Sequence, residues 1–386
     1  MTAAKTGSGP EAEWSPVLRS LLEHMLKVEA SDLYITAGSP PVFRIDGVGY
    51  PAKNPFTADQ VGVMAESLLT PPQRDEFRRH LELNLALALS SGGRFRANLF
   101  RQRGAVGLVI RLVRTSIRPL AELGHPPVLA DVMRSKRGLV LVVGGTGSGK
   151  STTLAAMIDH RNRIETGHII TVEDPVEFIH AHQQCVVTQR EVGIDTLSYR
   201  DALKNALRQA PDVILIGEIR DAETMESAIA FAETGHLCVS TLHANNANQA
   251  IERVLNFFPT DRQHEIRLQL SLNLRAIISQ RLVKTADGKG RRAAIEILIN
   301  TPIVADKLLK GEFHEIKAIM GKSRELGMKT FDYSLFELYN EGAISYEEAI
   351  RNADSANELR LNIKLSGGRQ PGNSELSTEP SLKSAG

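Results

Sequence analysis

The sequence has few of the residues that mark secreted, disulfide-linked or membrane-spanning proteins. It holds two cysteines, Cys185 and Cys238, and both stand in apolar, strand-like runs, which favours small buried hydrophobic residues over a disulfide or metal ligands. No stretch approaches the roughly 20 apolar residues that span a bilayer. The start of the chain also lacks the basic and apolar regions of a signal peptide. We therefore expect a cytoplasmic protein.

An excess of charge of one sign is missing as well. The chain has 46 basic and 45 acidic side chains, a formal net charge of +1. It therefore carries no overall electrostatic signature for nucleic acid or for an anionic membrane surface. This balance argues against a nucleic-acid translocase and leaves membrane contact to partner proteins.

The length of 386 residues suits two domains, each large enough to bury its own core. Residues 1–13 and 366–386 are rich in Gly, Ser, Pro, Thr and Glu, which predicts a flexible N-terminal tail and a disordered C-terminal tail. Between them we expect a first domain over 14–116, a linker over 117–127 and a second domain over 128–365.

The first domain reads as a small α+β domain. An amphipathic pattern predicts a helix over 17–28, and Thr57 with Gln60 forms a capping box for another helix, which Pro71-Pro72 closes. Runs over 83–89, 94–103 and 106–113 alternate as strands do, and predict an antiparallel meander.

The second domain has a different pattern, in which apolar strands alternate with helices. Strands are predicted over 139–143, 168–172, 185–188, 213–216 and 237–241. Continuous apolar runs separated by helical segments indicate a parallel sheet covered on both faces, so the fold class is α/β. Beyond Gln263 we expect mainly helix.

A phosphate-binding loop is the strongest motif in the chain. The segment Gly144, Gly145, Thr146, Gly147, Ser148, Gly149, Lys150, Ser151 fits G-x-x-x-x-G-K-[ST], and it lies between a predicted strand and a helix that begins near Thr152. Glycines let backbone amides turn toward phosphates, the lysine reaches the β and γ phosphates, and the Ser151 hydroxyl is placed to ligate Mg²⁺. The sequence therefore predicts binding of a nucleoside triphosphate with Mg²⁺.

Two acidic segments follow apolar strands and supply candidates for hydrolysis. Glu218 comes directly after the strand ending at Gly217, and Glu173 with Asp174 follows the strand over 168–172. Ligands of open α/β sheets bind at the carboxyl ends of the strands, so Glu218 is the leading candidate to orient water, with Glu173 second. Singly, such carboxylates are more often helix caps or solvated loop residues.

Histidines and arginines extend this set. His236 precedes the strand over 237–241 and His243 follows it, so His243 lies at the predicted ligand edge, where it could sense the γ phosphate. Arg94 and Arg96 share one face of a strand, and Arg111 lies on the next. A solvent-facing basic edge is the plainer interpretation of these arginines; an arginine finger supplied to a neighbouring subunit is the sharper one.

Together these segments resemble a known family. The phosphate loop, the acidic segment 169–177, the strand ending in Gly217-Glu218-Ile219-Arg220-Asp221 and the histidine segment 234–245 stand in the order of the Walker A, Asp, Walker B and His boxes of the secretion ATPases. Segments 93–96, 189–193 and 327–332 resemble the type IV pilus retraction branch, the PilT/PilU family. Segments 242–249 and 351–357 look most like its PilU-type accessory members, and 303–308 departs from the PilT-type stretch.

The resemblance implies a PAS-like N-terminal domain, a RecA-like P-loop ATPase domain with a helical C-terminal part, and a homo-hexameric ring that binds ATP and Mg²⁺. It implies catalytic or sensing roles for Glu173, Glu218, His236 and His243, and interface roles for Arg94, Arg96 and Arg111. It also implies a sister retraction ATPase and an inner-membrane pilus platform protein as partners, with the ring docked at the pilus base.

We therefore expect an ATP-hydrolysing motor that powers pilus retraction and twitching motility. An assembly or secretion motor is the nearest alternative, but two cysteines cannot build the four-cysteine zinc module typical of those relatives. A non-hydrolysing nucleotide-binding partner of another ATPase is the other alternative, and the presence of Lys150 and Glu218 argues against it.

Overall fold

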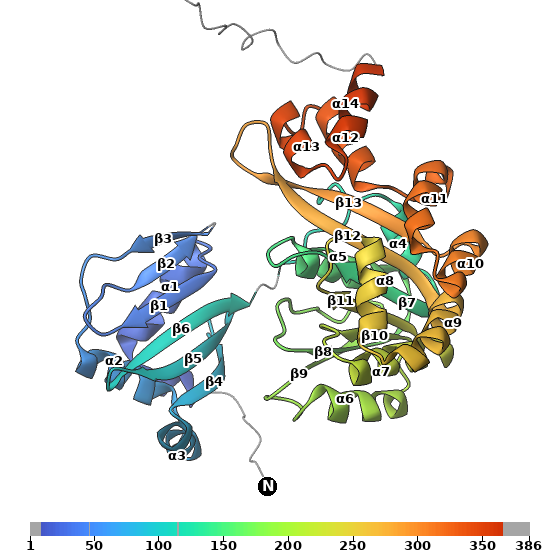
Figure 1. The fold of residues 1–386 in the computed structure, drawn as a ribbon. Helices are drawn as coiled ribbons and strands as arrows, with labels where there is room; N and C mark the ends of the chain where they lie inside the picture. Colours follow the sequence, from blue (N-terminus) through green and yellow to red (C-terminus); the bar gives the residue numbers. More distant parts are fainter. Residues whose placement is uncertain (1–8, 46, 114–115, 366–386) are drawn as a thin grey trace, which may run out of the picture. The chain divides into compact units, whose positions relative to one another are not determined.

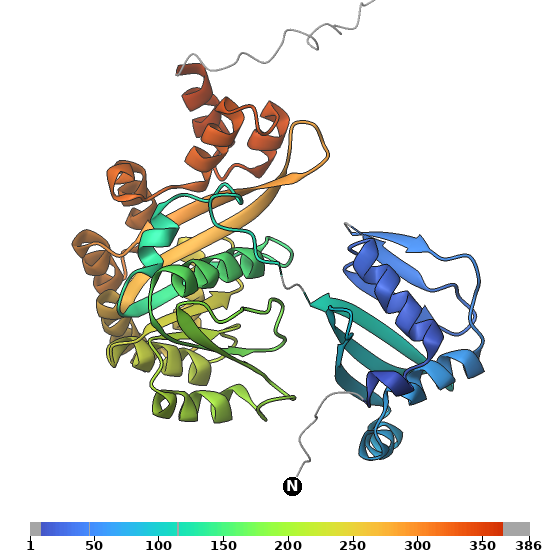
Figure 2. The ribbon, with the colours of Figure 1, turned by 180° about the vertical axis from the view of Figure 1, so that it is seen from behind.

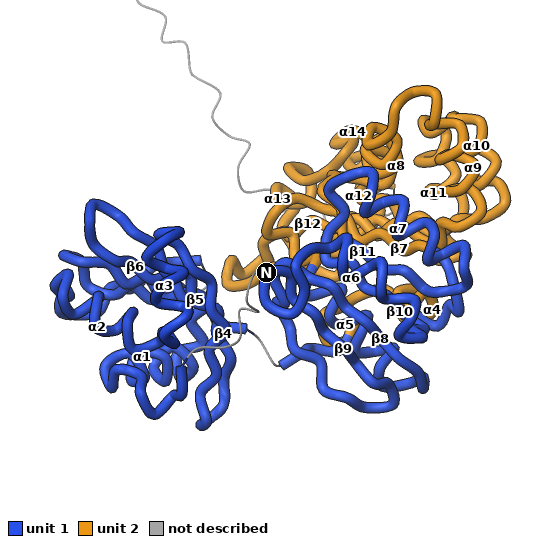
Figure 3. Tube along the Cα trace, turned by 90° about the horizontal axis from the view of Figure 1, so that it is seen from below, with its two compact units in different colours: residues 1–119, 133–138, 151–240 blue, residues 120–132, 139–150, 241–386 orange. Residues whose placement is uncertain are grey.

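The computed structural model describes residues 9–45, 47–113 and 116–365 (Figure 1). It divides into two compact units, one of residues 1–119, 133–138 and 151–240 and one of residues 120–132, 139–150 and 241–386 (Figure 3). We call them unit 1 and unit 2. The predicted tail 366–386 and residues 1–8 of the other predicted tail lie outside the described residues.

The first described residues, from Gly9, form a compact start to the fold. A 3-10 helix, Glu11–Glu13, leads into Trp14, which is 2% exposed and donates from Nε1 to the carbonyl oxygen of Gly9 at 2.8 Å. Composition alone placed residues 9–13 in a flexible tail. The buried indole explains the difference, because it anchors the segment that precedes it.

The first part of unit 1 is a six-stranded antiparallel sheet with the order β3-β2-β1-β6-β5-β4. Its strands are β1 (Asp32–Thr36), β2 (Val42–Ile45), β3 (Val48–Pro51), β4 (Glu82–Ala88), β5 (Arg94–Gln102) and β6 (Ala105–Val113). The predicted meander over 83–113 is confirmed.

Three helices accompany this sheet: α1 (Pro16–Lys27), α2 (Ala58–Leu68) and α3 (Pro71–His80). The capping box of Thr57 and Gln60 is confirmed at the start of α2. Pro71-Pro72 was expected only to close that helix, whereas it occupies the first turn of α3. Proline lacks a backbone N–H, so it ends one helix yet suits the first positions of the next.

The core of this part lies between the helices and one face of the sheet. Leu18 and Leu22 of α1 and Met64 of α2 join alternate residues of β5, Phe95 and Leu99, in one buried cluster. The period of two along β5 places Arg94 and Arg96 on the opposite face, as predicted.

A seven-stranded sheet has the order β13-β12-β7-β11-β10-β8-β9. The strands are β7 (Gly138–Val143), β8 (Gly167–Glu173), β9 (Cys185–Glu191), β10 (Val213–Ile216), β11 (Leu237–Leu242), β12 (Leu274–Lys284) and β13 (Arg291–Ile299). All five predicted strands are confirmed, and Cys185 and Cys238 are free and buried. The expectation of mainly helix beyond Gln263 is wrong for β12 and β13. Here β12 pairs in parallel with the distant β7, and β13 pairs antiparallel with the other edge of β12.

Helices flank these strands. Unit 1 holds α5 (Lys150–Ile164) from Ser151 onward, α6 (Tyr199–Ala206) and α7 (Ala222–Glu233), and α5 and α7 lie on opposite faces of β8 and β10 (Figures 1 and 2). Unit 2 holds α4 (Val128–Met133), α8 (Ala247–Asn256), α9 (Gln263–Asn273), α10 (Pro302–Lys310), α11 (Ile316–Lys322), α12 (Phe331–Asn340), α13 (Tyr346–Asn352) and α14 (Ala356–Leu365). Within the described ranges, no helix combines the length and apolar character of a bilayer span.

Candidate nucleotide site

The phosphate loop joins β7 to α5 and can be built only with glycine at certain positions. A Cβ on Gly144 would lie 2.4 Å from Ser148 Oγ and 2.6 Å from the carbonyl oxygen of Gln280. A Cβ on Gly149, whose φ is +89°, would lie 2.7 Å from Nε2 of Gln280. Both glycines therefore let the loop settle against β12, while a Cβ on Gly145 would meet nothing within 4 Å.

Lys150 begins α5 and folds back over this loop. Its Nζ donates to the carbonyl oxygens of Gly144 and Gly145, at 2.8 and 3.0 Å. Ser148 Oγ is buried and has no hydrogen-bond partner among the described residues. The loop thus combines a cationic side chain, a hydroxyl without a hydrogen-bond partner among the described residues and a helix N-terminus, a donor set that suits a phosphate group.

A pocket of about 510 Å³ lies beside the loop in unit 2. Gly144 and Gly145 line it together with His243, so the structure brings this predicted histidine to the phosphate loop. Three further polar residues line its wall and are not among the predicted site residues: Asn245, Gln249 and Arg253. Asn245 and Gln249 lie in the segments 234–245 and 242–249 that resemble the family, whereas only its position after His243 signalled Arg253.

The carboxylate edge, as we call Glu173 and Glu218, lies in unit 1 at the ends of β8 and β10. These strands pair in parallel, with Val172 beside Ile216, so their carboxyl ends meet at one edge. Gly217 keeps them close, because its N–H donates to the carbonyl oxygen of Val172 at 2.8 Å and a Cβ there would lie 3.1 Å from Cα of Glu173. The prediction that both carboxylates emerge at one edge is confirmed.

Glu173 is the more perturbed of the two acids. Burial raises its pKa to about 7, although hydrogen bonds from Thr171 Oγ1 at 2.7 Å and Gln189 Nε2 at 3.3 Å favour the ionised form. Its protonation state therefore changes near neutral pH, a property of many acids that take part in catalysis.

Glu218 has a different setting. Its side chain is 17% exposed and forms an ion pair of 2.6 Å with Nη2 of Arg220, whose pKa this hydrogen bond raises. Burial likewise raises the pKa of Tyr199, whose hydroxyl lies near Gly217. Arg220 thus fixes the position of this carboxylate at the end of β10.

His236 stands at the other end of β11 from His243. Its Nδ1 lies 3.2 Å from the carbonyl oxygen of Phe231 and 3.1 Å from Thr234 Oγ1, at the end of α7. These contacts describe a residue that closes a helix. Its sensing role stays a prediction.

Two of the three arginines have carboxylate partners far along the chain. Arg96 pairs with Glu191, and Arg111 Nε pairs with Asp32 Oδ1 at 2.8 Å, a hydrogen bond that raises the pKa of the arginine. Both line a pocket of about 300 Å³ that Thr152 also borders. Arg94 is exposed, and no ion pair involves it in the described part of the chain. The role in a neighbouring subunit stays a prediction for all three arginines.

Comparison with known proteins places these features in a family. Residues 11–310 match the family model described as type II/IV secretion system protein. The type IV pilus ATPase PilU of Pseudomonas aeruginosa is 55% identical over 89% of this chain and 91% of its own length. The type IV pilus retraction ATPase PilT of the same species is 41% identical over 87% of this chain and 98% of its own.

A solved structure gives the same result. The crystal structure of the pilus retraction motor PilT with bound ADP superposes with a TM-score of 0.82 at 38% identity, covering 89% of this chain and 98% of that one. The predicted order of an N-terminal α+β domain, an ATPase domain and a helical C-terminal part is thereby confirmed. The chain belongs to the type II/IV secretion system protein family, in the branch of the type IV pilus retraction ATPases.

Proposed function

We propose that this chain binds ATP at the phosphate loop and hydrolyses it to drive mechanical work. The observation that carries the proposal is the loop itself, in which Gly144 and Gly149 admit no side chain and Lys150 lies over the loop. A backbone shaped in this way offers N–H groups and one ammonium to a triphosphate. The relative PilT whose structure holds ADP supports the same assignment.

Magnesium fits the donor set at the start of α5. Ser151 would hold Mg²⁺ together with the phosphates, and the ion would take up negative charge on the phosphoryl oxygens. The hydroxyl is only partly exposed and stands in the first turn of the helix, next to Lys150.

The carboxylate edge supplies the groups for hydrolysis. Glu218, held by Arg220, orients the attacking water, and Glu173 changes protonation near pH 7 close to it. His243 senses the γ phosphate from the wall of the pocket beside Gly144. His236 relays the nucleotide state from the far end of β11, and Arg94, Arg96 and Arg111 act across a subunit interface. The roles of Glu218, Glu173 and His243 rest on their positions and charges, and those of His236 and the three arginines rest on the resemblance to the family.

The mechanical task is pilus retraction. The 55% identity to a protein named as type IV pilus ATPase PilU supports an accessory retraction motor of that type. We propose a homo-hexameric ring that works with a sister retraction ATPase on an inner-membrane platform protein. The ring lies in the cytoplasm at the pilus base, with ATP between subunits, and domain movement turns or releases the platform.

Turnover and pilus phenotype test the two levels separately. The purified chain should hydrolyse ATP with Mg²⁺, and Lys150→Ala should abolish turnover, whereas Lys289→Ala, at the exposed turn between β12 and β13, should not. A strain without the gene should keep surface pili and lose or weaken twitching, and the Lys150→Ala gene should fail to restore it. Loss of all surface pili would instead assign an assembly motor.

A further inference from the structure

Three consecutive residues of β12 connect the phosphate loop with distant parts of unit 2. Gln280 forms the floor of the loop, because its carbonyl oxygen is the atom that a Cβ on Gly144 would meet at 2.6 Å. Its neighbours Ser279 and Arg281 contact other segments. A shift of β12 would therefore move atoms that contact the phosphate loop and atoms that contact those other segments.

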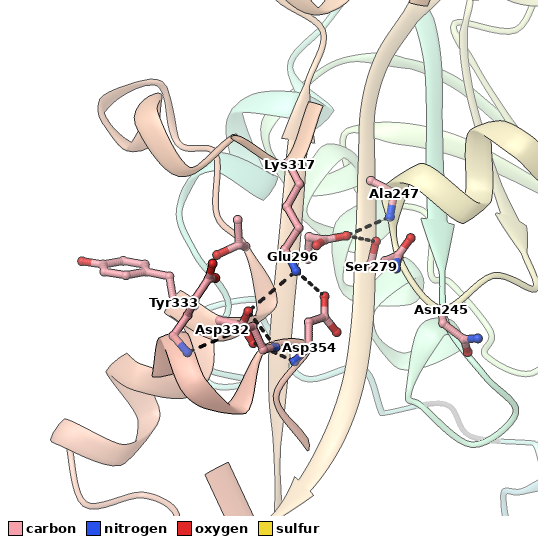
Figure 4. A network of polar contacts seen from close by, with 12 residues as sticks. Asn245, Ala247, Ser279, Glu296, Lys317, Asp332, Tyr333 and Asp354 are labelled. Atoms are coloured by element: carbon pink, nitrogen blue, oxygen red, sulfur yellow. Dashed lines mark hydrogen bonds and ion pairs between the residues drawn. The ribbon is translucent and has the colours of Figure 1, made fainter. Parts of the chain in front are cut away.

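Ser279 acts through Glu296 on the segment that follows His243. Glu296 is 2% exposed, and its Oε1 accepts from the N–H of Ala247 at 2.8 Å and from Ser279 Oγ at 3.1 Å (Figure 4). Ala247 is the first residue of α8, four positions after the histidine of the pocket wall. This buried carboxyl group thus holds the backbone at the start of α8 through a hydrogen bond.

Arg281 reaches the same segment and the C-terminal helices at once. Its Nη2 lies 3.5 Å from the carbonyl oxygen of Asn245 and 2.7 Å from Asp354 Oδ1, and its Nη1 donates to the carbonyl oxygen of Asn352 at 2.9 Å. The guanidinium also stacks on Phe331, 4.0 Å from the ring centre. One planar cation therefore joins the pocket wall to α12, to the end of α13 and to Asp354 in the segment that precedes α14.

Lys317 offers a contrast within this network. Its Nζ lies 3.0 Å from Asp354 and 3.7 Å from Asp332, so it stabilises the same C-terminal segment (Figure 4). No contact of Lys317 with the pocket wall is present in the described part of the chain. Asp354 therefore has two cationic partners, and only Arg281 also contacts the wall.

We propose that Arg281 is a positioning residue that couples the nucleotide pocket to the C-terminal helices over residues 331–365. When nucleotide moves the wall after His243, the distance between Arg281 and the carbonyl oxygen of Asn245 changes. The ion pair of Arg281 with Asp354 then changes as well, because the same nitrogen, Nη2, makes both contacts. Coupling is reciprocal, so breaking the ion pair alters nucleotide affinity. The inference rests on the proposed function, because the pocket must bind nucleotide.

Hydrogen–deuterium exchange of the full chain, with and without Mg·ATP, tests this coupling. In the unmodified protein, nucleotide should change exchange over 331–365 several-fold. Arg281→Lys keeps the charge, but its single nitrogen cannot reach the separate acceptors of Nη1 and Nη2 at once or stack on Phe331 as a planar group. The response should therefore be lost while nucleotide still protects residues 144–151. Asp354→Asn should give the same loss from the other side of the ion pair. Lys317→Ala should keep the response.

The outcomes separate this inference from the proposed function. Protection at 144–151 with no response over 331–365 in the unmodified protein overturns the coupling and leaves ATP binding intact. An equal loss of response in Lys317→Ala and Arg281→Lys also overturns it, because both changes would then act only on helix stability. Absence of protection at 144–151 removes the proposed function and the coupling with it.

Discussion

The phosphate loop and the carboxylate edge serve the same proposed reaction, yet they are built in different ways. The loop is shaped by backbone and by the absence of side chains at Gly144 and Gly149. The carboxylate edge depends on what surrounds each acid: Glu173 is partly buried and neutralised near pH 7, while Glu218 is paired with Arg220. Shape controls the first region, and electrostatic environment controls the second.

This difference predicts how each region responds to change. A cradle made of backbone tolerates no extra atom where its walls touch, but it tolerates a small side chain at open positions. An acid held by its environment tolerates an isosteric amide structurally while losing its chemistry. Substitutions at the loop should therefore act on binding, and those at the carboxylate edge on turnover or on its pH dependence.

The largest effect is expected at Gly144. In Gly144→Ala the new methyl group collides with Ser148 Oγ and with the backbone oxygen of Gln280, so the loop must shift. Misplacing a binding group by about 1 Å can lower an enzyme's rate on the order of 100-fold. We expect a loss of similar size in ATP affinity, which titration with a fluorescent nucleotide measures. Gly145→Ala is the matched control, because its methyl group enters open space and should change affinity by less than about 3-fold.

Melting temperatures of both variants separate a local effect from unfolding. Gly144→Ala should melt as a folded protein while failing to bind. Equal affinity in the two alanine variants would mean that the contact between loop and β12 does not shape the cradle.

The next largest effect is expected on ATP turnover, with little change in ATP affinity. Glu218→Gln keeps the shape of the side chain but removes the charge that orients water, so ATP turnover should fall by about 100-fold or more. Affinity for ATP should change little. Glu223→Gln, on the exposed first turn of α7, is the control and should retain turnover. Comparable turnover in the two variants would remove Glu218 from its proposed role.

Sequence reasoning succeeded where function depends on local shape. The motif around Lys150, the strands that end at Val143 and Ile216, and the position of Glu218 follow from residues close together in the chain. It failed for β12, because the run 274–284 fits helix or strand and its parallel partner β7 lies more than a hundred residues away.

The sequence also did not predict which charged residues pair with one another. Arg111 finds Asp32 at a separation of 79 residues, and Arg96 finds Glu191 at 95. The same holds for Glu296 and Arg281, whose roles depend on which segments the fold brings to them. Residue types showed which groups were available, while only the fold showed their partners.

A smaller effect should appear in the pH dependence of turnover. The pKa of Glu173 is raised to about 7, so the group is mostly ionised at pH 8 and mostly neutral at pH 6. If the ionised form is needed, turnover falls as pH decreases through 7, by about 10-fold between pH 8 and pH 6. Glu173→Gln should lower turnover at pH 8 and flatten this limb of the profile. An unchanged limb in the variant would assign the titration to another group.

The smallest effect is on stability and separates a structural acid from the carboxylate edge. Burial raises the pKa of Glu296 to about 7 from 4.5, even though Ala247 N–H and Ser279 donate to it. The folded state therefore holds a proton that the unfolded chain releases, and the free energy of unfolding falls as pH rises from 4.5 through 7.

Between pH 6 and pH 8 this group lowers the free energy of unfolding on the order of 1 kcal/mol, and Glu296→Gln should remove this loss in urea titrations. Glu173 contributes a loss of the same sign, whereas burial lowers the pKa of His180 to about 4, so this histidine contributes a gain as pH rises through 6.5. The expected result is therefore a change of slope on Glu296→Gln relative to the unmodified protein. A slope unchanged by Glu296→Gln would mean that Glu296 stays ionised in the folded protein, held by the charge of Lys317.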